Sequence, residues 1–149
     1  MAKKIVRVWK KVYENDLPYV VSELKESIER PATLILSGEV GTGKTTFCKI
    51  FIGNTQTVLS PTYSIVSEIA NTIHADFYRL KNPEEVVYLE LPLYLEGKEY
   101  FLVEWGKNFL NILDKEVDEK FHFYEITLES NEGTTHPSRN YTLKELERI

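Results

Sequence analysis

The feature that most limits what this chain can fold into is a glycine-rich segment, Gly38-Glu39-Val40-Gly41-Thr42-Gly43-Lys44-Thr45. It matches G-x-x-x-x-G-K-[ST] at every fixed position, which is the pattern of a phosphate-binding loop (P-loop). The apolar run at residues 33–36 precedes it and is typical of a strand buried on both faces. A helix is expected from Lys44 to Phe51, ended by Gly53. An ordinary turn would explain the glycines but not the Lys-Thr pair in this register, so the segment predicts phosphate binding.

The residues of this loop have distinct expected roles. Glycines let backbone N–H groups converge on phosphate oxygens without Cβ clashes, and the start of the following helix adds partial positive charge. Lys44 is expected to reach the β- and γ-phosphates of a nucleotide, and the Thr45 hydroxyl to ligate Mg²⁺. We therefore expect the phosphates to be held by Glu39, Val40, Gly41, Thr42, Gly43, Lys44, Thr45 and Thr46.

A second acid for the metal is expected at the end of a buried strand beside the P-loop strand. Tyr100-Phe101-Leu102-Val103-Glu104 is the one good candidate, because four apolar or aromatic residues run into an acid, with Trp105 next. An exposed glutamate at a strand end is the simpler alternative. Given the P-loop, we favour Glu104 as a residue that binds Mg²⁺ directly or through a water.

The segment from Ile73 to Arg79 alternates with a period of two. Its apolar residues 73, 75 and 77 share one face of a strand, and His74, Asp76 and Tyr78 share the other. In one reading His74 and Tyr78 face solvent and Asp76 is satisfied locally; in the other, Asp76 orients the attacking water, acts as a base or ligates the metal. The sequence leaves these readings open. For Arg79 we favour a surface position over a contact with the transferring phosphate.

A polar loop at residues 60–64 lies where P-loop proteins often place a nucleotide-sensing switch. Pro61 stiffens it, and the Thr62 hydroxyl could meet the metal or a γ-phosphate oxygen. A plain turn is the alternative.

Strand-like and helix-like segments alternate along the chain, which is typical of an α/β domain. The patterns predict strands at 5–12, 65–69, 73–78, 100–105 and 121–129, and helices at 17–29 (capped by Asp16), 83–89 and 107–113. The stretch from Arg139 fits a strand followed by a short helix. We expect residues 1–149 to form a single domain with three layers, P-loop NTPase-like, with a largely parallel central sheet and added antiparallel strands.

Composition narrows the functional classes. Eighteen Lys and Arg against 23 Asp and Glu give a net charge of −5, which argues against a stand-alone nucleic-acid binder. Five basic residues in the first eleven predict a charged edge strand or a contact patch for RNA or an acidic partner. A single cysteine, Cys48, excludes intrachain disulfides and multi-thiolate zinc sites, and we expect it to be a packed core residue. With no membrane-length apolar run or signal-peptide pattern, we expect a cytoplasmic protein without membrane association.

Four motifs together carry a family resemblance: GEVGTGKTT, SPTYSIV, HADFYRL and VEW, in this order between Gly38 and Trp105. The chain resembles the TsaE family, small bacterial P-loop ATPases that support synthesis of threonylcarbamoyladenosine in tRNA, next to the anticodon. Two positions depart from the family pattern. Gly106 follows VEW where proline is usual, and Glu90-Leu91-Pro92 stands where a glycine is often found.

The resemblance implies a role for each matched residue. Lys44 and Thr45 match the phosphate lysine and Mg²⁺ threonine, Thr62 the switch-loop threonine, Asp76 the acid implicated in hydrolysis, and Glu104 the glutamate at the metal. It also implies ATP or ADP as the nucleotide, binding to a TsaB–TsaD-type complex, and indirect contact with tRNA.

The expected function is therefore Mg²⁺-dependent ATP binding and slow ATP hydrolysis inside a tRNA-modifying assembly. Slow turnover of the isolated chain is expected because no internal arginine finger is evident. One alternative is a small-molecule or nucleotide kinase, although no Arg cluster for a lid follows the core. Another is a nucleotide-switched binding module that needs no turnover. A GTPase is disfavoured because N-K-x-D and D-x-x-G motifs are lacking.

Overall fold

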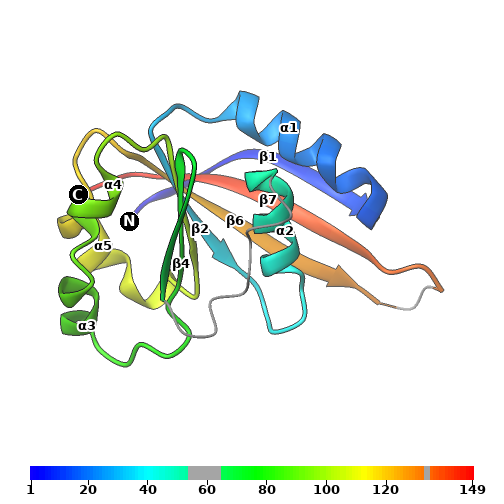
Figure 1. The fold of residues 1–149 in the computed structure, drawn as a ribbon. Helices are drawn as coiled ribbons and strands as arrows, with labels where there is room; N and C mark the ends of the chain where they lie inside the picture. The colour runs from blue at the N-terminus through cyan, green and yellow to red at the C-terminus, as the bar shows by residue number, and fades with distance from the viewer. Residues whose placement is uncertain (54–64, 133–134) are drawn as a thin grey trace.

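The computed structural model describes residues 1–53, 65–132 and 135–149 and is built on a seven-stranded mixed sheet (Figure 1). The strand order is β1-β7-β6-β2-β5-β4-β3. β2 pairs in parallel with both β5 and β6, and β5 pairs in parallel with β4. β7, β1 and β3 join as antiparallel strands. The expected parallel core with added antiparallel strands is confirmed.

The strands are β1 (Lys3–Val12), β2 (Ala32–Ser37), β3 (Val66–Ile69), β4 (Thr72–Asp76), β5 (Tyr100–Glu104), β6 (His122–Asn131) and β7 (Ser138–Leu146). The helices are α1 (Leu17–Ser27), α2 (Lys44–Ile52), α3 (Pro83–Tyr88), α4 (Leu91–Leu95) and α5 (Leu110–Glu116). Two short 3₁₀ turns, Glu14–Asp16 and Lys107–Phe109, lead into α1 and α5.

Helices cover both faces of the sheet and make three layers (Figure 1). Side chains alternate across β2, so Leu34 and Leu36 pack in the same core as α1 and α2. Ile35, between them, packs in the core shared with α3, α4 and α5. Both faces of β2 are therefore buried, which explains why its sequence has no polar alternation.

The structure corrects several local expectations. Asp16 does not cap α1 with its side chain; its carboxylate instead accepts a hydrogen bond from the Tyr13 amide, at 3.1 Å. α1 ends at Ser27 rather than residue 29. The stretch after Ser138 forms β7 and no helix, and α4 was not predicted. A non-glycine residue, Glu90, adopts a left-handed φ of 55° just before α4.

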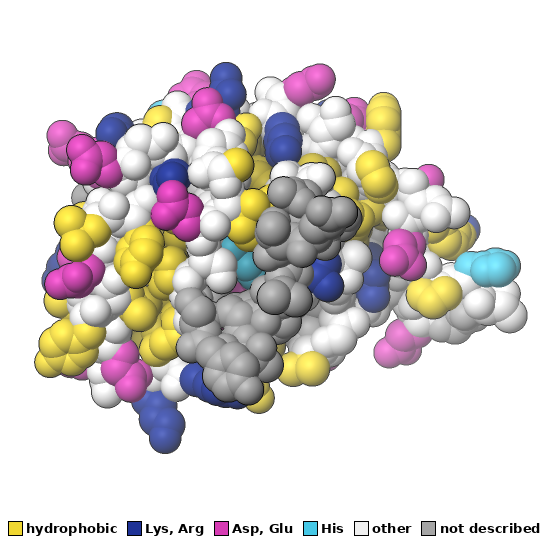
Figure 2. Space-filling view, viewed as in Figure 1, with side chains coloured by type: hydrophobic (Ala, Val, Ile, Leu, Met, Phe, Trp, Pro, Cys, Tyr) yellow, Lys and Arg dark blue, Asp and Glu magenta, His cyan; other side chains and the backbone are white. Residues whose placement is uncertain are grey.

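The surface has two notable regions. β1 lies at the edge of the sheet, as the basic first eleven residues predicted. Exposed hydrophobic side chains gather over α3 and α4, at the left of Figure 2: Val87, Tyr88, Leu93 and Tyr94. Among the described residues, no helix combines the length and apolarity needed to cross a membrane.

Candidate functional site

The glycine-rich loop joins the end of β2 to the start of α2, as the sequence predicted. A Cβ on Gly38 would lie 2.7 Å from both the Leu128 carbonyl oxygen and the Thr42 hydroxyl, so only glycine fits there. Gly43 has a φ of 93°, a left-handed conformation that favours glycine. Within the loop, the Thr42 hydroxyl donates to the Glu39 carbonyl oxygen at 2.7 Å. These constraints hold the loop in a compact turn ahead of the helix.

Lys44 is buried against this loop. Its Nζ donates to the carbonyl oxygens of Gly38 and Glu39, and lies 4.0 Å from the centre of the Trp105 ring. Burial lowers the pKa of Lys44, while the charges of Glu104 and Asp76 oppose that change. The ammonium is therefore held at the loop by carbonyl oxygens and an aromatic face.

The carboxyl ends of three parallel strands meet beside the loop. Strand register places Glu104 between Leu36 and Asp76. Glu104 is only 4% exposed, which rules out the alternative of a solvated glutamate at a strand end. Its Oε1 accepts a hydrogen bond from the Thr45 hydroxyl at 3.1 Å. The two residues expected at a metal site are thus in contact.

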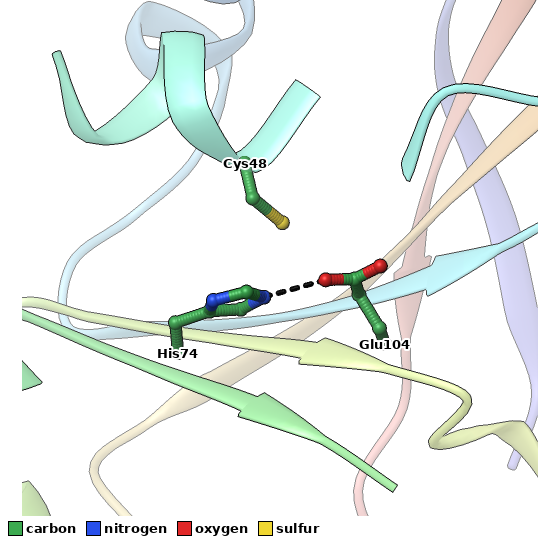
Figure 3. A group of neighbouring side chains, drawn as sticks. All are labelled: Cys48, His74 and Glu104. Carbon is green, nitrogen blue, oxygen red and sulfur yellow. Dashed lines mark hydrogen bonds and ion pairs between the residues drawn. The ribbon is translucent and has the colours of Figure 1, made fainter. Parts of the chain in front are cut away.

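The other oxygen of Glu104, Oε2, lies 2.6 Å from Nε2 of His74 (Figure 3). His74 is fully buried, so the reading in which it faces solvent is wrong. Because a carboxylate accepts and does not donate, Nε2 carries the hydrogen in this contact. His74 therefore fixes the orientation of Glu104 and leaves Oε1 directed to Thr45.

Cys48 completes a buried group with His74 and Glu104, whose ligand-type atoms all lie within 4.8 Å of one another (Figure 3). Burial raises the pKa of the Cys48 thiol well above its ordinary value, and the charges of Glu104 and Asp76 add to the effect. The thiol is therefore held in its protonated, unreactive form. Cys48 is a packed core residue, as expected.

The other polar residues of the HADFYR segment differ in how far they are buried and in what they contact. Asp76 is half-buried next to Glu104, and its Oδ1 accepts from the Tyr78 amide at 3.0 Å. Tyr78 is exposed and its ring lies 5.2 Å from that of Trp105. Arg79 is exposed, in line with the expected surface position. Trp105 itself has a left-handed φ of 60°, an unfavourable conformation for an aromatic residue, beside the site.

A pocket of about 400 Å³ opens over the loop. Its lining includes six predicted phosphate-binding residues: Val40, Gly41, Gly43, Lys44, Thr45 and Thr46. Glu104 and Trp105 also line it. Glu39 lines a neighbouring groove of about 1050 Å³ instead, and Thr42 does so too. Thr62 lies outside the described residues.

Two residues near the loop were missed by sequence reasoning. Arg139, from β7, lines the same pocket. Glu125, from β6, is buried and accepts hydrogen bonds from Ser37 at 2.8 Å and Lys3 at 3.0 Å. Burial alone would raise the pKa of Glu125, but these two hydrogen bonds and the Lys3 charge hold it below its ordinary value. Neither residue belongs to a recognisable motif, because long-range strand pairing brings them here.

Known proteins are similar to this chain in sequence, and a solved structure is similar to it in fold. A protein of Rickettsia conorii, tRNA threonylcarbamoyladenosine biosynthesis protein TsaE, is 31% identical over 108 residues, covering 67% of this chain and 61% of that protein. The Haemophilus influenzae protein of the same name is 36% identical over 97 residues, covering 60% and 61%. The matches thus span about three fifths of the length of these curated relatives.

The crystal structure of Bacillus subtilis YdiB shares the fold, with a TM-score of 0.63 at 23% identity, covering 99% of this chain and 89% of that one. The family model described as threonylcarbamoyl adenosine biosynthesis protein TsaE matches residues 13–140, which include the loop, both metal-site candidates and Arg139. The chain therefore belongs to the TsaE family.

Proposed function

We propose that this chain binds ATP and Mg²⁺ at the glycine-rich loop, hydrolyses ATP slowly, and serves as a cytoplasmic accessory protein in the threonylcarbamoyladenosine modification of tRNA. A TsaB–TsaD-type complex is its proposed partner, and its contact with tRNA is indirect. The observation that carries the proposal is the Thr45–Glu104 contact of 3.1 Å at the mouth of a loop that also holds Lys44. The family membership supplies the biological setting.

The residues present fit a magnesium ion. Mg²⁺ prefers oxygen ligands in octahedral geometry, and two neighbouring ligands at bond lengths of about 2.0–2.1 Å are about 2.9 Å apart. The Thr45 hydroxyl and Glu104 Oε1 are already near that separation. When bound, the ion would neutralise charge that develops on the phosphates.

The protein's own groups supply the rest of the proposed chemistry. Backbone N–H groups of the loop hold phosphate oxygens. The Lys44 ammonium exchanges its carbonyl partners for β- and γ-phosphate oxygens, which are stronger acceptors because they are charged. His74 keeps Glu104 in place through the 2.6 Å hydrogen bond. Asp76, with one oxygen on the Tyr78 amide, orients the attacking water through the other.

Two further features support the setting of the proposal. The exposed hydrophobic group over α3 and α4 is typical of a protein–protein contact. A single buried cysteine fits a reducing compartment. In comparable enzymes an arginine finger supplied by a partner accelerates turnover by about 10³–10⁵-fold, so we expect the isolated chain to be slow.

The test combines recruitment and catalysis. Tagged chain is incubated with purified TsaB and TsaD, with and without ATP and Mg²⁺, and phosphate release and modified tRNA are measured. We expect nucleotide-dependent capture of the partners and faster phosphate release in their presence. Equal turnover alone and in the complex would contradict the proposal. Full tRNA modification by a hydrolysis-defective Glu104→Gln chain would indicate a nucleotide-switched binding module instead.

A further inference from the structure

Arg139 reaches the glycine-rich loop from the far end of the sequence. It is the second residue of β7, the strand that follows β6 in an antiparallel pair. Its guanidinium carbon and Nη1 each lie 3.1 Å from the position that a Cβ on Gly43 would occupy. The guanidinium therefore packs directly on the loop backbone, at the start of α2, and forms one wall of the pocket.

Packing behind Arg139 holds the side chain in this place. Tyr141, two residues further along β7, is 2% exposed and stacks on Phe47 of α2, with ring centres 6.1 Å apart. Burial raises the pKa of the Tyr141 phenol, and the neighbouring Arg139 guanidinium opposes that rise. The guanidinium is thus fixed between the loop and a buried phenol rather than free in solvent.

The positive charge of Arg139 has no acidic partner within the described residues. None of the ion pairs found among them includes Arg139. The guanidinium hydrogen-bonds the neutral Tyr141 phenol, while its Nε is buried and has no hydrogen-bond partner there. A buried polar group without a partner is unfavourable, and a partly buried cation is stabilised by an anion placed against it. The pocket that Arg139 lines is where such an anion would lie.

We propose that Arg139 binds the α- and β-phosphates of the nucleotide. The assignment rests on the proposed function, because it needs a nucleotide on the loop. The α- and β-phosphates are favoured because loop amides hold these groups in a P-loop and Arg139 lies against the loop backbone at Gly43. In the proposed nucleotide complex, the γ-phosphate side is assigned to Lys44 and to the Thr45–Glu104 pair, which line the same pocket.

This location predicts an effect on affinity that is the same for ADP and ATP. Loss of a charged hydrogen bond of this kind raises the dissociation constant by roughly 10- to 100-fold. Arg139→Gln keeps most of the side-chain length but removes the charge. Arg139→Lys keeps the charge but loses the planar donor group, so it should recover only part of the affinity.

The experiment titrates the full chain with Mg²⁺–ADP and Mg²⁺–ATP by calorimetry. Variants are Arg139→Gln, Arg139→Lys and a control, Arg30→Gln. Arg30 is an exposed arginine that pairs with Glu99 at 3.3 Å. It lies just before the first residue of β2, whereas the glycine-rich loop follows the last residue of that strand. We expect both ligands to weaken by a similar factor in Arg139→Gln, KM for ATP to rise more than kcat falls, and the control to bind as the wild type does.

The outcomes separate this inference from the proposed function. Wild-type affinities in Arg139→Gln, or a loss confined to ATP, would overturn the assignment to the α- and β-phosphates while the proposed function stands. A wild-type chain that binds neither nucleotide would instead overturn the proposed function. Thermal unfolding shows whether each variant is folded. If Arg139→Gln does not fold, Arg139→Lys decides: unchanged ADP affinity in that folded variant refutes the contact.

Discussion

Glu104→Gln is the substitution that separates metal chemistry from folding at this site. The side chain keeps its shape and loses its charge. Its amide oxygen can still accept from His74, where the hydrogen bond is now 2.6 Å, and its amide N–H can donate to the Thr45 hydroxyl, now 3.1 Å away. Exchanging a charge-assisted hydrogen bond for a neutral one costs about 1 kcal/mol. For a domain of this size that lowers Tm by about 2–4 °C.

The effect on hydrolysis should be much larger than the effect on stability. Losing one preorganised electrostatic contact costs about 2.7–4 kcal/mol in the transition state, or about 10²–10³-fold in rate. The amide is a weaker Mg²⁺ ligand than the carboxylate, while the loop that holds the phosphates is unchanged. Nucleotide affinity in the absence of Mg²⁺ should therefore stay near that of the wild type.

The assay measures phosphate release at saturating ATP over a series of Mg²⁺ concentrations, with calorimetry for nucleotide affinity. Glu99→Gln is the matched control, because Glu99 is a half-exposed acid that pairs with Arg30 just before the same strand. Hydrolysis by Glu104→Gln that equals the wild type at every Mg²⁺ concentration would refute the reasoning.

Three further outcomes are expected. Gly38→Ala places a methyl 2.7 Å from a backbone carbonyl of β6, so urea unfolding should report a loss of about 1–3 kcal/mol from that clash. Gly41→Ala also strains a backbone of positive φ, 84°, but its methyl meets no atom within 4 Å, so it should lose less than Gly38→Ala. Lys44→Ala should weaken ATP binding by about 10- to 100-fold, and the ATP-dependent change in Trp105 fluorescence should diminish, since the ammonium lies over that ring. Because the pKa of Glu125 is held below 4.5, its stabilising contribution is complete above pH 4.5 and is lost as the pH falls through the lowered value. Glu125→Gln should then lose less stability than the wild type between pH 7 and pH 3; an equal loss would contradict this assignment.

The parts of the site that are local in sequence were predictable. The β2–loop–α2 unit follows from an apolar run, glycines at fixed spacing and a helix-ending Gly53, each of which acts over a few residues. Glu104 was expected at the end of a buried strand beside the P-loop strand, and the parallel pairing of β2 with β5 places it there.

What depends on tertiary packing was not predictable. The alternation in β4 placed His74 on one face but could not tell that α2 covers that face, so a solvent-facing histidine remained open. Arg139 reaches the loop through the β6–β7 pairing, which no short-range signal reports. α4 begins with Leu91 and Pro92 after the left-handed Glu90, and five residues are too few for a helical period to show.

The pairing of β1 with β7 has a consequence for how the chain matures. Lys3 lies opposite Leu146, so β1 is synthesised long before β7, the neighbour with which it pairs. Contacts between such distant segments form slowly. Meanwhile this strand, with its exposed valines and isoleucine, could pair with other nascent chains. The lysines beside them oppose such pairing, because their positive charges repel those of a neighbouring copy. The cluster of positive charge at the edge of the sheet is thus suited to protecting the nascent chain from aggregation until β7 has been synthesised.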